Sequence, residues 1–149
     1  MKTTARFDKA IQKLYTAYLD NNLNPECCKQ CAVGTILDGK DSWKHLSNYH
    51  GSLELNYVGQ VHESFGRTFN GYTPSELLLI EQTFLKSCGY QVPLNYKNTK
   101  PLNLDNNSIF EALFKTFECL LELDDYSFDL NIKDIVTRRY PKNKMAFNM

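Results

Sequence analysis

Cysteine and histidine side chains gather in residues 24–50 with the spacing of zinc ligands. Cys28 and Cys31 are separated by two residues, thirteen residues follow, and His45 and His50 are separated by four. This spacing fits the general pattern of a zinc site, in which thiolate sulfur and imidazole nitrogen are the preferred ligands. We therefore predict a zinc or iron site, with these candidate ligands: Cys27, Cys28, Cys31, His45 and His50, with His62 as an extra imidazole.

Three other interpretations of these residues stay open. Cys28 and Cys31 form a C-x-x-C pair, which in the first turn of a helix has a favoured thiolate and supports thiol redox chemistry. Free cysteine is also among the most buried residue types, so the thiols would then simply pack in a helical core. Finally, His62 with Glu63 in a pocket near Tyr57 and Tyr72 would suit a small enzyme.

The elements expected to position the cluster are helices. Asn24 is a good N-cap and Pro25 a good first helical residue, so a helix is predicted to begin there and to place Cys31 one turn after Cys27 and Cys28. Asp41 or Ser42 would cap the next helix, which carries the following residues: Trp43, His45, Leu46 and Tyr49.

Apolar residues at helical spacing continue through the rest of the chain. They predict helices over 7–18, from 53 to about 65, over 108–121 and over 130–140, and Thr73-Pro74-Ser75-Glu76 predicts a helix start with a capping box. In the helix after residue 53, Leu55, Val58, His62 and Phe65 share a stripe, which makes His62 a candidate buried core histidine. We expect an all-α bundle of six or seven helices in a single domain over 1–149, with an irregular crossover at 90–107 and a frayed tail at 141–149.

Composition and charge narrow the function classes. The 149 residues carry 17 Lys and Arg and 17 Asp and Glu, so the formal net charge is zero. The chain therefore lacks the positive charge expected of a protein that binds nucleic acid, and nucleic acid is not expected as a partner. No apolar run approaches the length of a membrane helix, and the first residues lack the apolar core of a secretion signal. We expect a cytoplasmic protein with reduced thiols, no membrane insertion, and a protein partner or self-association.

The segments FDKAIQKLYTAYLDNNLNPECCKQCAVGTIL and HGSLELNYVGQVHESFGRTFNGYTPSELLLIEQTFLKSCGY resemble a small bacterial family. Its members are often named after a component of the Na+-translocating NADH-quinone reductase, and the resemblance covers about residues 6–95. It implies an electron-transfer or thiol-redox accessory role, without a catalytic residue to carry over. The chain lacks a nucleotide-binding glycine motif, so NAD and flavin are not expected, and its cysteine spacing differs from that of plant-type iron–sulfur proteins.

Overall fold

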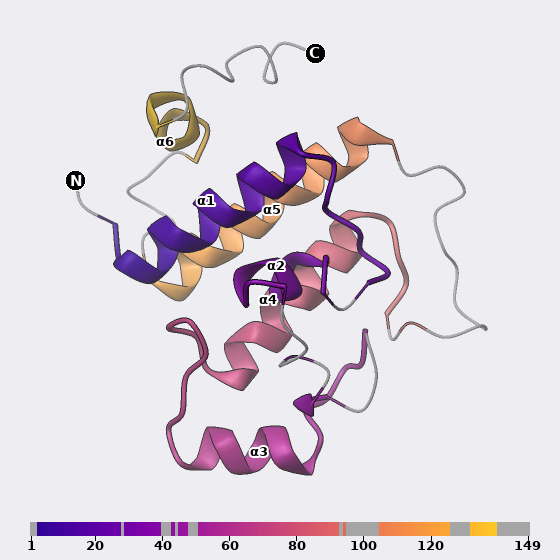
Figure 1. Ribbon diagram of the computed structural model, residues 1–149, viewed down its shortest axis with the longest axis vertical. Coiled ribbons are helices and arrows are strands. Elements are labelled where there is room, and N and C mark those ends of the chain that lie inside the picture. The colour runs from indigo at the N-terminus through magenta and orange to yellow at the C-terminus, as the bar shows by residue number, and fades with distance from the viewer. Residues whose placement is uncertain are drawn as a thin grey trace.

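The chain folds into six α-helices over the residues that the computed structural model describes, which are 3–27, 29–39, 43, 45–47, 51–92, 94, 105–125 and 132–139 (Figure 1). In order, the helices are α1 (Ala5–Leu19), α2 (Ala32–Ile36), α3 (Tyr57–Ser64), α4 (Pro74–Ser87), α5 (Asn106–Leu123) and α6 (Ile132–Arg139). The described part contains two isolated β-bridges and no strand. The predicted all-α class is thus confirmed.

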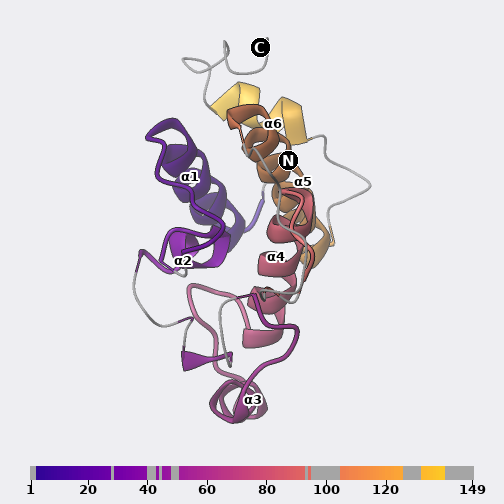
Figure 2. The ribbon, with the colours of Figure 1, turned by 90° about the vertical axis from the view of Figure 1, so that its right-hand side faces the viewer.

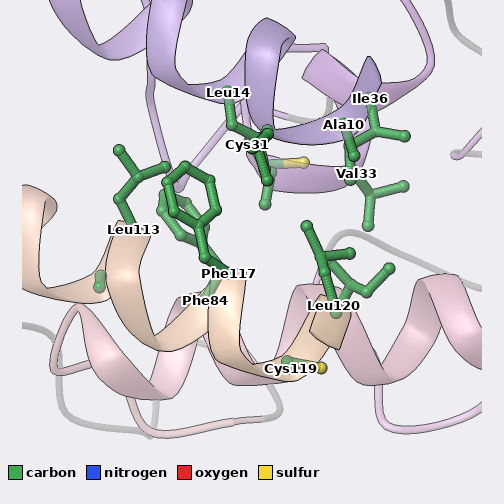
Figure 3. Packing of buried hydrophobic residues seen from close by; sticks show 14 of the residues in the cluster. Ala10, Leu14, Cys31, Val33, Ile36, Phe84, Leu113, Phe117, Cys119 and Leu120 are labelled. Carbon is green, nitrogen blue, oxygen red and sulfur yellow. The ribbon is translucent and has the colours of Figure 1, made fainter. Parts of the chain in front are cut away.

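The hydrophobic core lies where α1, α2, α4 and α5 meet. α5 packs along α4 and also contacts α1, while the short α2 fits between α1 and α4. Apolar side chains from all four helices interdigitate there, with Cys31 among them (Figure 3). α3 and α6 lie at opposite ends of the molecule, and α3 contacts the body mainly through α4 (Figure 2). None of the described helices combines the length and the apolar composition of a membrane-crossing segment.

Local sequence signals explain several helix boundaries. The capping box predicted at the start of α4 is present, because Thr73 Oγ1 accepts the Glu76 N–H at 3.2 Å and the Glu76 carboxylate accepts the Thr73 N–H at 2.9 Å. Before this helix, Asn70 and Gly71 have φ values of 53° and 90°, and Phe69 and Tyr72 exchange two backbone hydrogen bonds. These features define a two-residue turn of the type that Asn-Gly favours.

One arginine joins the ends of three helices. Arg6 of α1 forms ion pairs with Glu76 of α4 at 2.9 Å and with Asp124, just after α5, at 2.6 Å. Its guanidinium also lies 4.5 Å from the centre of the Tyr72 ring. Because Thr4 donates to the second oxygen of Asp124 at 2.5 Å, the start of α1 is held from two sides.

The prediction that a helix begins at Asn24 is wrong. The Asn24 side chain accepts the Glu26 N–H at 3.0 Å in a tight turn, and the Asn24 N–H donates to Gln30 O at 2.8 Å, which closes a loop. α2 begins only at Ala32. Asparagine side chains stabilise such turns as well as helix starts, so an Asn-Pro pair does not distinguish a turn from the start of a helix.

Two further predictions fall partly or wholly outside the described residues. Trp43 and His45 lie in a single turn, closed by a 3.0 Å hydrogen bond from Leu46 N to Trp43 O, and Ser47 then pairs with Leu55 in an antiparallel bridge. A short 3-10 turn therefore carries Trp43 and His45, but it ends before Ser47, earlier than expected, and Tyr49 lies outside the described residues. Most of the 90–107 crossover and all of the 141–149 tail lie outside the described residues.

Candidate functional site

Cys27 and Cys31, the two described cysteines among the predicted ligands, do not share the helix predicted for them. Cys27 is half-buried in the closed loop, Cys31 is fully buried at the start of α2, and the His45 side chain is exposed. Cys28 and His50 lie outside the described residues. Within the described ranges, no three His, Cys, Asp or Glu side chains are grouped so that they could hold a metal ion. Zinc or iron binding therefore stays a prediction, and it depends on the two ligands whose positions are not described.

Cys31 acts as the N-cap of α2. Its Sγ accepts the Gly34 N–H at 3.3 Å, in the position where a serine or aspartate oxygen usually stands. The side chain is 0% exposed, and burial together with the nearby Glu81 carboxylate and a hydrogen bond to it raises the pKa of the thiol well above its usual value. The thiol is therefore protonated at neutral pH. A protonated, sealed thiol is a poor nucleophile and a poor redox group.

A buried carboxyl group beside Cys31 is the feature that sequence reasoning missed. Glu81 of α4 is 2% exposed, and its Oε1 accepts the Val33 N–H, in the first turn of α2, at 3.2 Å. Charged side chains rarely lie this deep unless they are paired or hydrogen-bonded. The carboxyl group thus joins α4 to the start of α2. A signal existed, because Glu81 interrupts the apolar face that runs along this helix from Leu77 to Phe84.

Cys88, the C-cap of α4, also feels the charge of Glu81. Burial, with a smaller effect of the Glu81 charge, raises the pKa of Cys88 to about 12. The thiol is 4% exposed and packs in the core. Cys31 and Glu81 therefore form a buried polar contact between α2 and α4, and the sulfur atoms of Cys31 and Cys88 are both shielded from solvent.

The residues proposed for a small enzyme are not brought together. Glu63 accepts hydrogen bonds from the backbone N–H and the hydroxyl of Ser75. His62 is half-buried, with its Nδ1 3.1 Å from Arg67 Nη1, so it is neither sealed in the core nor paired with a carboxylate among the described contacts. Tyr72 is 0% exposed whereas Tyr57 is 79% exposed. The two tyrosines therefore do not line a shared pocket.

The outer side of α3 exposes large apolar side chains to solvent. Tyr57, Val58 and Phe65 are 79%, 46% and 72% exposed, and Val61 is half-buried. At 3.6 residues per turn these four side chains lie within about 100° of the helix circumference. Val58 and Phe65 belong to the stripe expected in the core, so the structure turns that part of the stripe outward.

A glycine explains how α3 comes to face outward. Gly59 is the buried residue of this helix, and a Cβ placed on it would lie 2.3 Å from the carbonyl oxygen of Leu46. The helix therefore rests on the body through backbone contact at its glycine side. The Asn56 side chain caps the helix by accepting the Gly59 N–H at 2.8 Å and holds the same loop by donating to His45 O and Ser47 O. We call the surface formed by Tyr57, Val58, Val61 and Phe65 the α3 outer face.

The resemblance to the reductase-labelled bacterial family stays a prediction, since none of the site geometry bears on it. We compared the chain with protein-family models, with curated proteins and with solved structures, and found no match.

Proposed function

We propose that this chain is a helical protein-interaction module that binds through the α3 outer face. The observation that supports it is an amphipathic helix with its glycine side on the body and its apolar side in solvent. Water contact with a contiguous apolar surface is unfavourable, and such surfaces commonly mark interaction sites. The buried, protonated thiols favour this function over redox chemistry at Cys31.

The partner that this face fits best is a second copy of the chain. In an antiparallel pair of α3 helices centred on Val61, Val61 meets Val61 and Tyr57 meets Phe65 of the other copy, because Tyr57 and Phe65 lie equally far from Val61 in the sequence. A symmetric dimer requires such a self-complementary surface.

Charges at the two ends of the face support the same arrangement. Glu54 precedes α3 and Arg67 follows it. Antiparallel pairing therefore places Glu54 of one copy beside Arg67 of the other. Both are exposed, and neither has an ion pair among the described residues. The Arg67 guanidinium lies 5.5 Å from the Phe65 ring centre, so its charge stands at the edge of the apolar face. Opposite charges at both edges would fix the register.

The size of the face indicates a weak dimer. An eight-residue helix is about 12 Å long, and stable interfaces bury roughly 1,200–2,000 Å² in total. Two further exposed leucines lie outside this helix, one before it and one on α4. Leu53, 44% exposed, accepts a hydrogen bond at its carbonyl from Gln82 of α4, and Leu79, 47% exposed, lies one turn before Gln82. We expect association in the micromolar range or weaker.

A charge-swap experiment tests this function. Sedimentation equilibrium of the full chain at rising concentration should show a reversible monomer–dimer equilibrium. Glu54→Arg and Arg67→Glu should each weaken the dimer by about tenfold, which corresponds to about 1.4 kcal/mol, and the double variant should restore it. Leu19→Ser, at a 41% exposed position on α1, is the matched control and should change nothing. A chain that stays monomeric at all concentrations, or a double variant as weak as the singles, would contradict the proposal.

A further inference from the structure

The one Asn-Gly pair and the one Asp-Gly pair of the sequence meet in a tertiary contact. Asn70-Gly71 forms the two-residue turn before α4, Asp38-Gly39 follows the end of α2, and Asn70 Nδ2 donates to Asp38 Oδ2 at 3.3 Å. In each pair a glycine nitrogen follows a side-chain carbonyl carbon, and glycine has no side chain to block attack of its nitrogen on that carbon. Both pairs are therefore candidates for spontaneous cyclisation to a succinimide.

The fold protects the Asp-Gly pair. The Gly39 N–H donates to Gly34 O at 2.8 Å, so its nitrogen is held in a backbone hydrogen bond. The Asp38 side chain forms an ion pair with Lys13 at 2.7 Å, and an ionised carboxylate is a poor electrophile because it has no good leaving group. Cyclisation at Asp38 would therefore have to break both contacts.

The Asn-Gly pair has no such protection at its nitrogen. No acceptor for the Gly71 N–H lies among the described residues, and both residues of the pair are exposed, so water reaches the turn. The carboxamide of Asn70 donates to Ile36 O at 2.7 Å, but this contact engages its nitrogen and not the carbon that is attacked. An uncharged carboxamide can also lose ammonia. Of the two pairs, only Asn70-Gly71 thus combines an available nucleophile, an electrophile and solvent.

We propose that Asn70 is a self-modification site, which deamidates in the folded chain and so detaches the Asn-Gly turn from the end of α2. The Gly71 nitrogen bonds to Asn70 Cγ, the Cγ–Nδ2 bond breaks, and the proton from Gly71 leaves in ammonia. Water then adds to either carbonyl carbon of the succinimide and opens the ring to aspartate or isoaspartate. The net reaction takes up one water molecule and releases one ammonia, and no atom is oxidised or reduced.

The product carboxylate cannot keep the contacts of the carboxamide. Asn70 Nδ2 donates to Ile36 O and to Asp38, whereas a carboxylate at this position has no N–H to donate and carries the same charge as Asp38. Lys13 keeps its own bonds to Ile36 O and Asp38, so α2 stays tied to α1. The change is local, and it is one-way because ammonia is lost. None of these residues belongs to the α3 outer face, so this inference is independent of the proposed dimer.

Peptide mapping by mass spectrometry tests the modification in the full chain, kept folded at mildly alkaline pH. Asn70 should be the first asparagine to show the mass change of deamidation, and an isoaspartyl methyltransferase should label the same peptide. Asp38 should isomerise only in a parallel sample unfolded in urea, because unfolding releases the Gly39 nitrogen. The proposal is overturned if Asn70 stays intact in the folded chain after the urea sample has deamidated it, or if another asparagine reacts first.

Asn70→Asp reproduces one product and tests the structural consequence. It should lower the melting temperature by about 2–4 °C, the scale of a lost surface contact in a chain of this length. Adding Asp38→Asn should restore the melting temperature, because the new carboxamide can donate to the new carboxylate. Asn107→Asp, at an exposed position in the first turn of α5, is the charge-matched control and should not lower it. An Asn70→Asp variant as stable as the parent, or a double variant no more stable than the single, would show that the carboxylate does not detach the turn.

Discussion

Removal of the Glu81 carboxyl group should loosen α2 from α4. In the unchanged protein the Val33 N–H donates to Glu81 Oε1 at 3.2 Å. In Glu81→Ala this buried N–H loses its acceptor, and the Cys31 thiol loses the carboxyl group beside it. An unsatisfied buried donor costs about 1–3 kcal/mol. The lost side-chain packing adds about 0.8 kcal/mol per buried methylene. We expect a total loss of about 2–4 kcal/mol in the free energy of unfolding.

Glu81→Gln is the matched control, because its amide oxygen can still accept the Val33 N–H. It should lose about 1 kcal/mol or less, since only the charge on the hydrogen bond changes. Urea unfolding followed by circular dichroism measures the free energy of unfolding of both variants. In thermal unfolding, the alanine variant should melt roughly 5–15 °C below the parent protein. A typical domain has about 5–15 kcal/mol of stability, so both variants should stay folded.

Hydrogen exchange gives the local readout. The Val33 and Gly34 amides should exchange faster in Glu81→Ala than in Glu81→Gln, while amides in the middle of α5 should follow global stability alone. If the alanine variant is as stable as the glutamine variant, or if the Val33 amide exchanges equally fast in both, the hydrogen bond does not hold α2 and the reasoning is refuted.

Three further predictions follow from other residues. Burial raises the pKa of the Cys88 thiol to about 12, whereas the thiol of the unfolded chain has a pKa near 8.5. The protonated thiol therefore stabilises the fold fully below about pH 8.5, and this stabilisation falls by up to about 1.4 kcal/mol per pH unit as the pH rises towards 12. Cys88→Ala should therefore flatten the alkaline loss of stability measured by urea unfolding from about pH 8.5 to 10.5, and an unchanged slope would contradict the shift. Gly59→Ala should lower the melting temperature although alanine favours helix by about 1 kcal/mol, because the added Cβ meets Leu46 O; a higher melting temperature would contradict the close contact. Elemental analysis of untagged, reduced protein should find about one zinc or iron per chain if the predicted ligands act together, and Cys28→Ser should then lose it; absence of metal in anaerobically handled protein would end that hypothesis.

Helix starts were predictable where the local signal had one meaning. The four residues from Thr73 to Glu76 combine a cap, a proline and a reciprocal glutamate, and few other structures use all three. Asn24-Pro25 combines only two signals, both of which also suit a turn. The actual cap of α2 is the sulfur of Cys31, which the usual preferences for oxygen side chains do not reveal.

The orientation of α3 could not be read from spacing alone. Periodicity shows which residues share a face, but it does not show whether that face meets the core or solvent. The decision depended on Gly59 and its contact with the Leu46 carbonyl, and this contact exists only in three dimensions. Glu81 was more accessible to sequence reasoning, since a carboxylate on an otherwise apolar helix face signals a buried partner.

The tie between Arg6 and Asp124 has a consequence for how the chain is made. The two residues are 118 positions apart, so at about 5–20 residues per second the ribosome needs roughly 6–24 s to add the second after the first. During that interval the apolar side of α1 has no α5 to cover it. Until then only the nearer segments, α2 among them, can cover this side of α1, and a message that stops before residue 124 yields a product without the ion pair between Arg6 and Asp124.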